Sequence, residues 1–153
     1  MSDTSEVVSV ERVIPAPASA IFALLADPTR HKDIDGSGSV RDAKEASQRL
    51  ALGSTFGMSM KIGVPYAMRS TVIEFEDDKR IAWQTRGPGR IGALVGGRIW
   101  RYELEPVDGG TLVKETWDIT QESALSKPAV RQAAKKTAEN MAATLDRIAD
   151  RFA

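Results

Sequence analysis

Cysteine is missing from this chain of 153 residues, and histidine occurs only once, at His31. The lack of cysteine excludes disulfide bonds, thiol catalysis and cysteine-ligated metals, and it is typical of a reducing compartment. One histidine without cysteine also leaves too few ligands for an ordinary zinc site. We therefore expect no metal ion and no other cofactor.

Long apolar runs and an excess of either charge are also absent. No stretch approaches the roughly 18 apolar residues that suggest a membrane-spanning helix, and the first ten residues lack the apolar core of a signal peptide. Lysine and arginine number 21, as do aspartate and glutamate, whereas nucleic-acid binding requires a clustered basic surplus. These absences predict a cytoplasmic protein with no integral membrane segment and no nucleic-acid partner.

What the sequence does contain is enough for one ordinary core. Hydrophobic residues make up 42% of the chain, and no internal repeat, low-complexity tract or linker divides it. We therefore expect a single domain over residues 1–153. The sequence leaves open whether the protein is a monomer or a homodimer.

The longest helical pattern runs from Lys127 to Phe152. Apolar residues recur along it at steps of three or four, which is the spacing of one helix face. Ser126 offers a capping hydroxyl, and Pro128 suits the first turn. At about 1.5 Å per residue the helix would span roughly 35–40 Å, with no second long helix beside it. The rest of the chain must therefore supply a sheet that curves around this helix.

Apolar alternation and turn residues predict the remaining elements. Two short helices are expected at Pro17–Ala26 and Pro28–Ile34. Seven strands are expected at Glu6–Ile14, Ser39–Ala46, Thr55–Ile62, Tyr66–Glu76, Arg80–Arg86, Arg98–Glu105 and Thr111–Thr120. Tight turns at Asp77-Asp78 and Asp108-Gly109-Gly110 favour antiparallel hairpins. The predicted fold class is α+β, a curved seven-stranded antiparallel sheet around a long C-terminal helix, with two short helices after the first strand.

Several segments together resemble a known superfamily. They are Ile14-Pro15-Ala16-Pro17, Ile21-Phe22-Ala23-Leu24-Leu25-Ala26-Asp27-Pro28, His31 with Asp35-Gly36-Ser37-Gly38, Trp100-Arg101-Tyr102-Glu103-Leu104-Glu105-Pro106 and Gly109-Gly110-Thr111-Leu112-Val113-Lys114-Glu115-Thr116. Their layout is similar to the helix-grip fold of the START-like, or SRPBCC, superfamily, which includes birch-pollen-allergen relatives and polyketide cyclase/dehydrase-like proteins. The resemblance implies an apolar cavity between sheet and helix, but it carries over no catalytic residues.

A cavity of that kind would be an ordinary small-ligand site. The strand with Phe56, Met58, Met60 and Ile62 presents apolar side chains at period two, and methionine suits a surface that adapts to varied ligands. The same strand could equally fill a solid core. The predicted ligand-binding residues are Phe22, Phe56, Met58, Met60, Phe75, Trp83, Arg98, Trp100, Tyr102, Glu115, Trp117, Met141 and Leu145.

Glu115 is the polar residue that stands out in this set. If Val113 and Trp117 point inward, strand parity turns Glu115 inward too, where a carboxylate must be paired, hydrogen-bonded or protonated. Arg98 and Tyr102 on the neighbouring strand have the right parity to reach it. The three side chains could fix the polar end of a ligand, or they could form a structural network.

His31 is a second candidate for chemistry. It follows Pro28 on a short helix near Asp33 and Asp35, and a histidine beside carboxylates can act as a general base. The alternative is a surface residue or a helix-terminal contact. The candidate catalytic residues are therefore Glu115, Tyr102 and His31.

Gly87, Gly89 and Gly92 form a G-x-G-x-x-G pattern, but no helix follows to bind a pyrophosphate. We interpret Gly87–Gly97 instead as a loop that could act as a lid or as a contact for a second subunit.

Together these observations predict a protein that binds a small hydrophobic molecule, lipid or polyketide-like, between the sheet and the C-terminal helix. One alternative is a polyketide cyclase/dehydratase-type enzyme that uses an acid/base group in the cavity. The other is a non-catalytic interaction or dimerisation module.

Overall fold

The structure is a computed structural model that describes residues 6–36, 40–43, 49–62, 64–87, 90 and 94–153, with the backbone alone for 40–43, 59–62 and 64–66. In this part of the chain seven strands form one antiparallel sheet in the order β1-β7-β6-β5-β4-β3-β2. The strands are β1 (Val7–Ile14), β2 (Val40–Ala43), β3 (Thr55–Ile62), β4 (Val64–Glu76), β5 (Arg80–Arg86), β6 (Gly96–Val107) and β7 (Gly110–Asp118).

The observed sheet confirms the predicted fold class. Tight turns at Asp77-Asp78 and Asp108-Gly109 join β4 to β5 and β6 to β7 as antiparallel hairpins, as their turn residues indicate. Gly110 shows why glycine is needed after the second turn. Its φ of +149° lies in the region that favours glycine, and an added Cβ would stand 2.0 Å from the Ile14 carbonyl oxygen.

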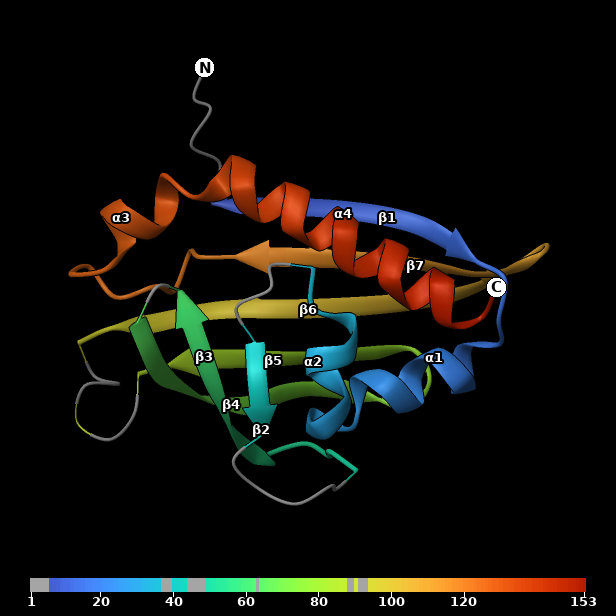
Figure 1. Cartoon of the computed structure of the whole chain (residues 1–153), viewed down its shortest axis with the longest axis horizontal. Coiled ribbons are helices and arrows are strands. Elements are labelled where there is room, and N and C mark those ends of the chain that lie inside the picture. The colour runs from blue at the N-terminus through green and yellow to red at the C-terminus, as the bar shows by residue number, and fades with distance from the viewer. Residues whose placement is uncertain (1–5, 37–39, 44–48, 63, 88–89, 91–93) are drawn as a thin grey trace.

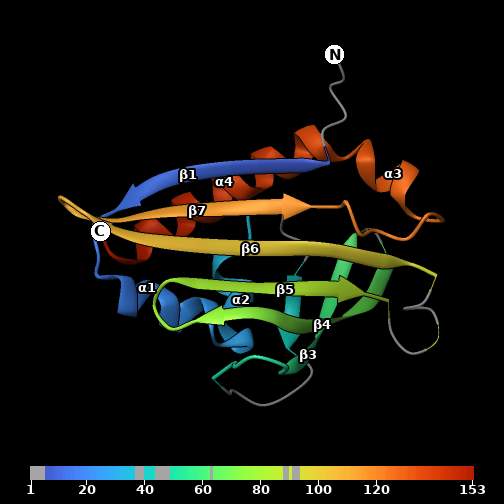
Figure 2. The same cartoon turned by 180° about the vertical axis from the view of Figure 1, so that it is seen from behind.

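The two short helices after β1 and the long C-terminal helix cover one face of the sheet, which we call the inner face, as the two opposite views in Figures 1 and 2 show. The chain passes from β1 into α1 (Ala18–Leu25), a 3₁₀ turn at Pro28–Arg30 and α2 (His31–Ile34). Asp27 caps the 3₁₀ turn by accepting a hydrogen bond from the Thr29 N–H at 3.0 Å. The C-terminal α4 (Ala134–Arg151) lies beside β1 and β7.

The prediction of one unbroken helix from Lys127 to Phe152 is wrong. The structure has α3 (Lys127–Arg131), a break at Gln132 and Ala133, and then α4. None of the residues of α3 is buried, whereas α4 buries one continuous face. Lys127 and Arg131 of α3 both pair with Glu6, the residue before β1, and Val130 packs against the apolar cluster that contains Trp117 and Ile119. Neither glycine nor proline marks the break, so periodicity alone could not place it.

The buried residues of the inner face form two apolar clusters. The larger contains residues of α1, β3, β5 and the C-terminal half of α4, among them Phe22, Trp83 and Leu145. The smaller consists of Trp117, Ile119, Ala134 and Met141, at the other end of α4. Val10 and Trp100 pack against both clusters, so they lie at the boundary between the two.

The turn after α2 docks directly on α4. The Gly36 N–H donates to Thr144 Oγ1 at 2.9 Å, and Arg147 Nη1 donates to the Asp35 carbonyl oxygen at 2.7 Å. A Cβ on Gly36 would lie 2.4 Å from the Asn140 carbonyl oxygen, so only glycine allows this close approach. The contact fixes Asp35 beside the helix that covers the inner face.

Candidate functional site

Glu115 lies in the middle of β7, between Val113 of the larger cluster and Trp117 of the smaller one. The strand register places it opposite Tyr102 on β6 and Val10 on β1. The residue is only 3% exposed, and its Oε1 has no hydrogen-bond partner among the described residues. The prediction that strand parity turns this carboxyl inward is confirmed.

Tyr102 is the hydrogen-bond partner of Glu115 in the site. Burial raises the pKa of Glu115 to about 8, a hydrogen bond from the Tyr102 hydroxyl lowers it, and the nearby charge of Asp35 raises it. Burial, together with the Glu115 charge, also raises the pKa of the Tyr102 phenol well above its ordinary value. At neutral pH both groups therefore carry a proton, and the second carboxyl oxygen is free to donate or accept one further hydrogen bond.

Aromatic rings continue from Tyr102 across the inner face. Trp83 on β5 lies 5.7 Å from Tyr102 between ring centroids, and Phe56 on β3 lies 5.6 Å from Trp83 at nearly a right angle. His31 of α2 stacks on Trp83, with a centroid distance of 4.9 Å and an interplanar angle of 19°. Edge-to-face and offset arrangements of this kind are the favourable ones for aromatic pairs. Strands distant in sequence thus present one row of rings that ends at Glu115.

His31 is buried, at 8% exposure, and so does not match the alternative of a surface residue. Its Nε2 lies 2.9 Å from the Leu25 carbonyl oxygen. Because a carbonyl oxygen can only accept, Nε2 carries the proton of the neutral ring. Burial lowers the pKa of His31, against smaller opposite effects of the Leu25 carbonyl, Asp27 and Asp35. Asp33, expected near the ring, instead pairs with Arg30 at 3.0 Å.

Asp35 is the site residue that sequence reasoning did not include. Its charge acts on Glu115, Tyr102 and His31, so it lies close to all three. It reaches them because Gly36 and the Asp35 carbonyl are bonded to α4, more than 100 residues away in sequence. The sequence indicated that Asp35 lies near His31, but neither that spacing nor the turn glycine after it identifies Glu115 and Tyr102 as its neighbours.

Arg98 does not join Glu115, and the predicted trio with Tyr102 is therefore wrong. Its guanidinium makes two bonds to Glu122, with Nε–Oε1 and Nη2–Oε2 distances of 3.2 and 3.0 Å. The Glu122 side chain is fully buried and also accepts from the Ser126 hydroxyl. Parity indicates a common face, but Arg98 and Tyr102 are four residues apart, which is about 13 Å along a strand.

The other predicted ligand-binding residues lie on the helix-covered side of the sheet where they are described. Phe22 and Phe75 meet edge to face at 5.5 Å, and Met58 is buried near Phe56. Trp100 lies between the clusters, Trp117 and Met141 belong to the smaller one, and Leu145 belongs to the larger. The side chain of Met60 lies outside the described residues.

The glycine-rich segment Gly87–Gly97 is described only at Gly87, Arg90 and residues 94–97, and Gly89 and Gly92 lie outside the described residues. Its C-terminal end is bonded to the connection between β7 and α3, where Ser123 N–H donates to the Gly96 carbonyl oxygen at 2.8 Å. Leu94 is exposed. The lid and subunit-contact interpretations of this segment stay predictions.

No group of three or more His, Cys, Asp or Glu side chains in the described part of the chain is arranged to hold a metal ion. Among the same residues, no helix is both long and apolar enough to cross a membrane. The described side chains of the candidate site supply polar groups of their own. The site combines a carboxylic acid that is neutral at pH 7, a phenol and a second carboxylate beside a row of aromatic rings.

A family model described as polyketide cyclase/dehydrase and lipid transport matches residues 5–153. The uncharacterised protein Rv0088 of Mycobacterium tuberculosis is 33% identical over 146 residues, which make up 92% of this chain and 61% of that protein. The chain thus spans about three fifths of the curated relative that it matches.

Solved structures of low identity share the fold. Protein NE0264 of Nitrosomonas europaea aligns with a TM-score of 0.72 at 17% identity, over 98% of this chain and 95% of that one. The di-domain ARO/CYC StfQ from the steffimycin biosynthetic pathway aligns with a TM-score of 0.70 at 9% identity, over 95% of this chain and 49% of that one. The predicted START-like, or SRPBCC, membership is confirmed by the family model and by these neighbours.

Proposed function

This chain belongs to the polyketide cyclase/dehydrase and lipid transport family, and from that premise we propose that it binds a small, largely apolar molecule between the inner face of the sheet and α4. Glu115 and Tyr102 hold the one polar group of this ligand. The aromatic row from Tyr102 to Phe56 contacts its apolar body. Sites of this composition, mostly apolar with a few polar groups that fix orientation, are typical for small molecules.

The observation that carries the proposal is the state of the Glu115 carboxyl. A buried polar atom without a hydrogen bond costs about 1–3 kcal/mol, and folded proteins leave few such atoms. Oε1 of Glu115 is such an atom among the described residues, and Glu115 lies on β7 between the buried Val113 and Trp117 and opposite Tyr102. A ligand oxygen at hydrogen-bond distance from Oε1 would remove that cost.

The apolar contacts supply most of the affinity in this account. A ligand that buries about 200 Å² of apolar surface gains roughly 5 kcal/mol before the costs of association are subtracted. The polar contact to Glu115 then adds orientation and a smaller share of the binding free energy.

The proposal is tested by comparing the ligand affinities of the wild type and of matched variants. Native mass spectrometry of freshly purified protein, followed by organic extraction, is expected to reveal a co-purifying apolar molecule. Glu115→Leu, which removes the polar contact and keeps the bulk, is expected to weaken rebinding of the extracted molecule at least tenfold, which corresponds to about 1.4 kcal/mol. Tyr102→Phe, which removes only the hydroxyl, is expected to weaken it several-fold.

The matched control is Thr116→Val on the same strand. Thr116 is buried on the opposite face, where its hydroxyl lies 2.8 Å from Ser9 Oγ. This variant loses the buried hydrogen bond to Ser9, on the face of the sheet opposite the site, but should bind the ligand with wild-type affinity. The proposal fails if no molecule co-purifies and apolar probes do not bind, or if Glu115→Leu binds as tightly as Thr116→Val.

A second candidate function, acid/base catalysis on a β-keto substrate of the cyclase or dehydratase type, is favoured by one observation. The pKa of Glu115 is raised to about 8, close to neutral pH, where a general acid is most effective. The charge of Asp35 contributes to this raised pKa of Glu115. Exchange of the protons next to the carbonyl of a bound ketone with solvent deuterium would distinguish catalysis from binding, if the wild type accelerates it and Glu115→Gln does not.

A further inference from the structure

The polar groups of the candidate site differ in one respect from those that bind fatty acids or phosphorylated lipids. None of the ion pairs in the described part of the chain includes Glu115, whose assigned hydrogen-bond partner is the Tyr102 phenol. We propose that the site selects uncharged ligands that present a ketone, ester or hydroxyl oxygen to Glu115, and that it rejects carboxylates and phosphates. This inference rests on the proposed binding function and narrows its ligand class.

The inward-facing arginine nearest in register is already neutralised. Arg98 lies on the same face of β6 as Tyr102, but its guanidinium bonds both oxygens of the fully buried Glu122. A bidentate pair of this kind is among the strongest side-chain contacts, and breaking it would leave a buried charge uncompensated. Arg98 is therefore not available as a counter-ion for a ligand carboxylate.

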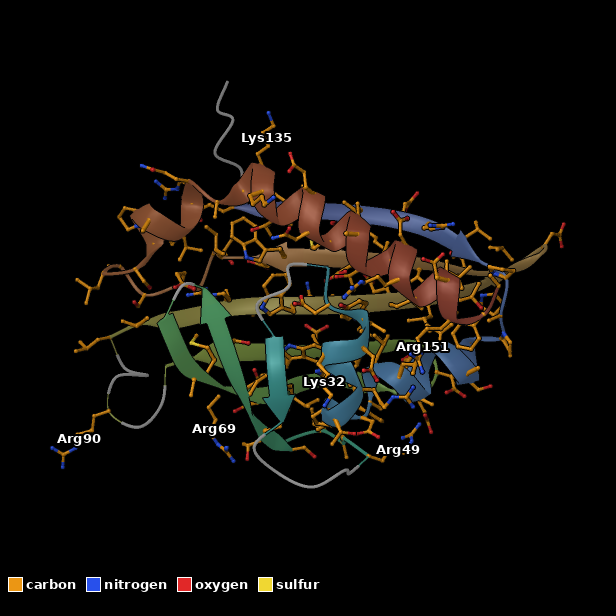
Figure 3. The ribbon with its side chains drawn as sticks, viewed as in Figure 1. Lys32, Arg49, Arg69, Arg90, Lys135 and Arg151 are labelled. Carbon is orange, nitrogen blue, oxygen red and sulfur yellow. The ribbon has the colours of Figure 1, made fainter. Side chains whose placement is uncertain are left out.

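Several other basic side chains that the structure describes are paired or exposed. Arg12 of β1 pairs with Asp146 of α4 at the surface. In Figure 3 the labelled side chains of Arg90 and Lys135 extend away from the sheet and the helices, and the exposed Arg69 donates to Thr55 Oγ1 of β3 at 3.3 Å. None of these four side chains is therefore a counter-ion for a ligand at Glu115.

A negative charge, that of Asp35, does act on the site. The charge of Asp35 acts on both Glu115 and Tyr102, so an anion placed against Oε1 would be repelled by Asp35, whose carbonyl oxygen accepts a hydrogen bond from the exposed Arg147. Two like charges about 6 Å apart repel by roughly 3 kcal/mol at an effective dielectric constant of 20. Transfer of the ligand charge out of water adds to this cost. An anionic ligand must therefore enter in its neutral, protonated form.

A protonated Glu115 carboxyl can donate a hydrogen bond to an uncharged ligand oxygen, such as that of a ketone. Because its pKa is raised to about 8, the Glu115 carboxyl is protonated at pH 7 and can donate to a ketone oxygen through Oε1. Above pH 8 the carboxyl ionises and the donor is lost. Affinity for a neutral acceptor should then fall with rising pH in the wild type.

The experiment is equilibrium dialysis of two probe pairs that differ only in the head group. 2-Acetylnaphthalene is compared with 2-naphthoate, and 1-decanol with decanoate, so that aromatic and alkyl bodies are separated as well. At pH 7 the neutral member of the better-bound pair should bind at least 100-fold more tightly. The carboxylate should gain about tenfold in affinity for each pH unit between 7 and 5, because its own pKa is about 4–5.

A second arm uses Glu115→Gln, whose amide donates at every pH. Wild-type affinity for the neutral probe should fall at least fivefold between pH 7 and pH 9, and the variant should show no such fall. The proposed selectivity for neutral ligands fails, while the binding function stands, if the carboxylate binds within tenfold of its neutral partner at pH 7. The same holds if the affinities of the variant and of the wild type change with pH in the same way. If neither member of either pair binds, the proposed binding function fails and this inference fails with it.

Discussion

Glu115→Gln is expected to stabilise the protein relative to the wild type by on the order of 4 kcal/mol more at pH 8.5 than at pH 5. The pKa of Glu115 is raised to about 8 in the folded protein by burial, whereas the unfolded chain has the ordinary value near 4.5. Each pH unit between these two values costs the folded wild type about 1.4 kcal/mol. A glutamine at this position has the same shape and does not titrate.

The direction of the effect follows from proton binding. Between pH 4.5 and 8 the folded protein keeps the Glu115 proton and the unfolded chain releases it. The stabilisation due to protonated Glu115 is therefore complete below pH 4.5 and is lost as the pH rises toward 8. This effect is large compared with the 5–15 kcal/mol total stability of an ordinary domain.

The measurement is denaturant unfolding of both proteins at several pH values from 5 to 9. Glu105→Gln is the control, since Glu105 is an exposed residue of β6 that should leave the pH profile of the wild type unchanged. Parallel profiles for the wild type and Glu115→Gln would show that Glu115 ionises in the fold at its ordinary pKa, and the description of the site would then be wrong.

His31→Ala is the second large effect, with an expected loss of about 3 kcal/mol in the free energy of unfolding at pH 7.5. The substitution removes the ring that stacks on Trp83 and meets the edge of Phe56, and it leaves the Leu25 carbonyl without the Nε2 donor. The cost is comparable to that of other large-to-small changes in an aromatic core.

The loss should shrink in acid. Burial lowers the pKa of His31 in the fold, so the unfolded chain takes up a proton below pH 6.5 before the folded protein does. The wild type is therefore destabilised as the pH falls below 6.5, and His31→Ala, which has no ring to protonate, is not. Denaturant unfolding of the wild type and His31→Ala at pH 7.5 and at pH 5 measures both the loss of stability and its decrease in acid.

His31→Phe is the matched control for this second prediction. It keeps a ring against Trp83 but has no titrating group and no hydrogen bond to Leu25. It should therefore lower the free energy of unfolding by about 1–2 kcal/mol at pH 7.5. Unlike the wild type, it should lose no stability through this position as the pH falls below 6.5. If His31→Ala lost stability to the same extent at pH 5 and pH 7.5, the neutral buried state of the ring would be refuted.

Strand parity and turn residues were sufficient to predict the sheet and the orientation of its central acid. Alternation in β6 and β7 places Tyr102 opposite Glu115, and Asp108-Gly109-Gly110 fixes the register that brings them together. Side chains at period two must share a face, so this part of the site follows from local pattern alone.

The parts of the site that depend on packing between distant segments were not predictable. Arg98 has the correct parity but a buried partner, Glu122, that lies in an irregular connection. Asp35 reaches the site because Gly36 fits against Asn140 and Thr144 of α4, a contact that no local pattern encodes. The helix break at Gln132 likewise has no glycine or proline in the sequence to mark it.

The measurement that tests the account most directly is a pH titration of the Glu115 side-chain carboxyl by ¹³C NMR, with and without 2-acetylnaphthalene. The account predicts a midpoint near pH 8 for the free protein, because the carboxyl is buried and unpaired by any cation. It also predicts a higher midpoint with the ketone bound, because the ligand binds the protonated form. A midpoint near 4.5, or one that the ketone leaves unchanged, would contradict the assignment of Glu115 as the ligand's polar partner.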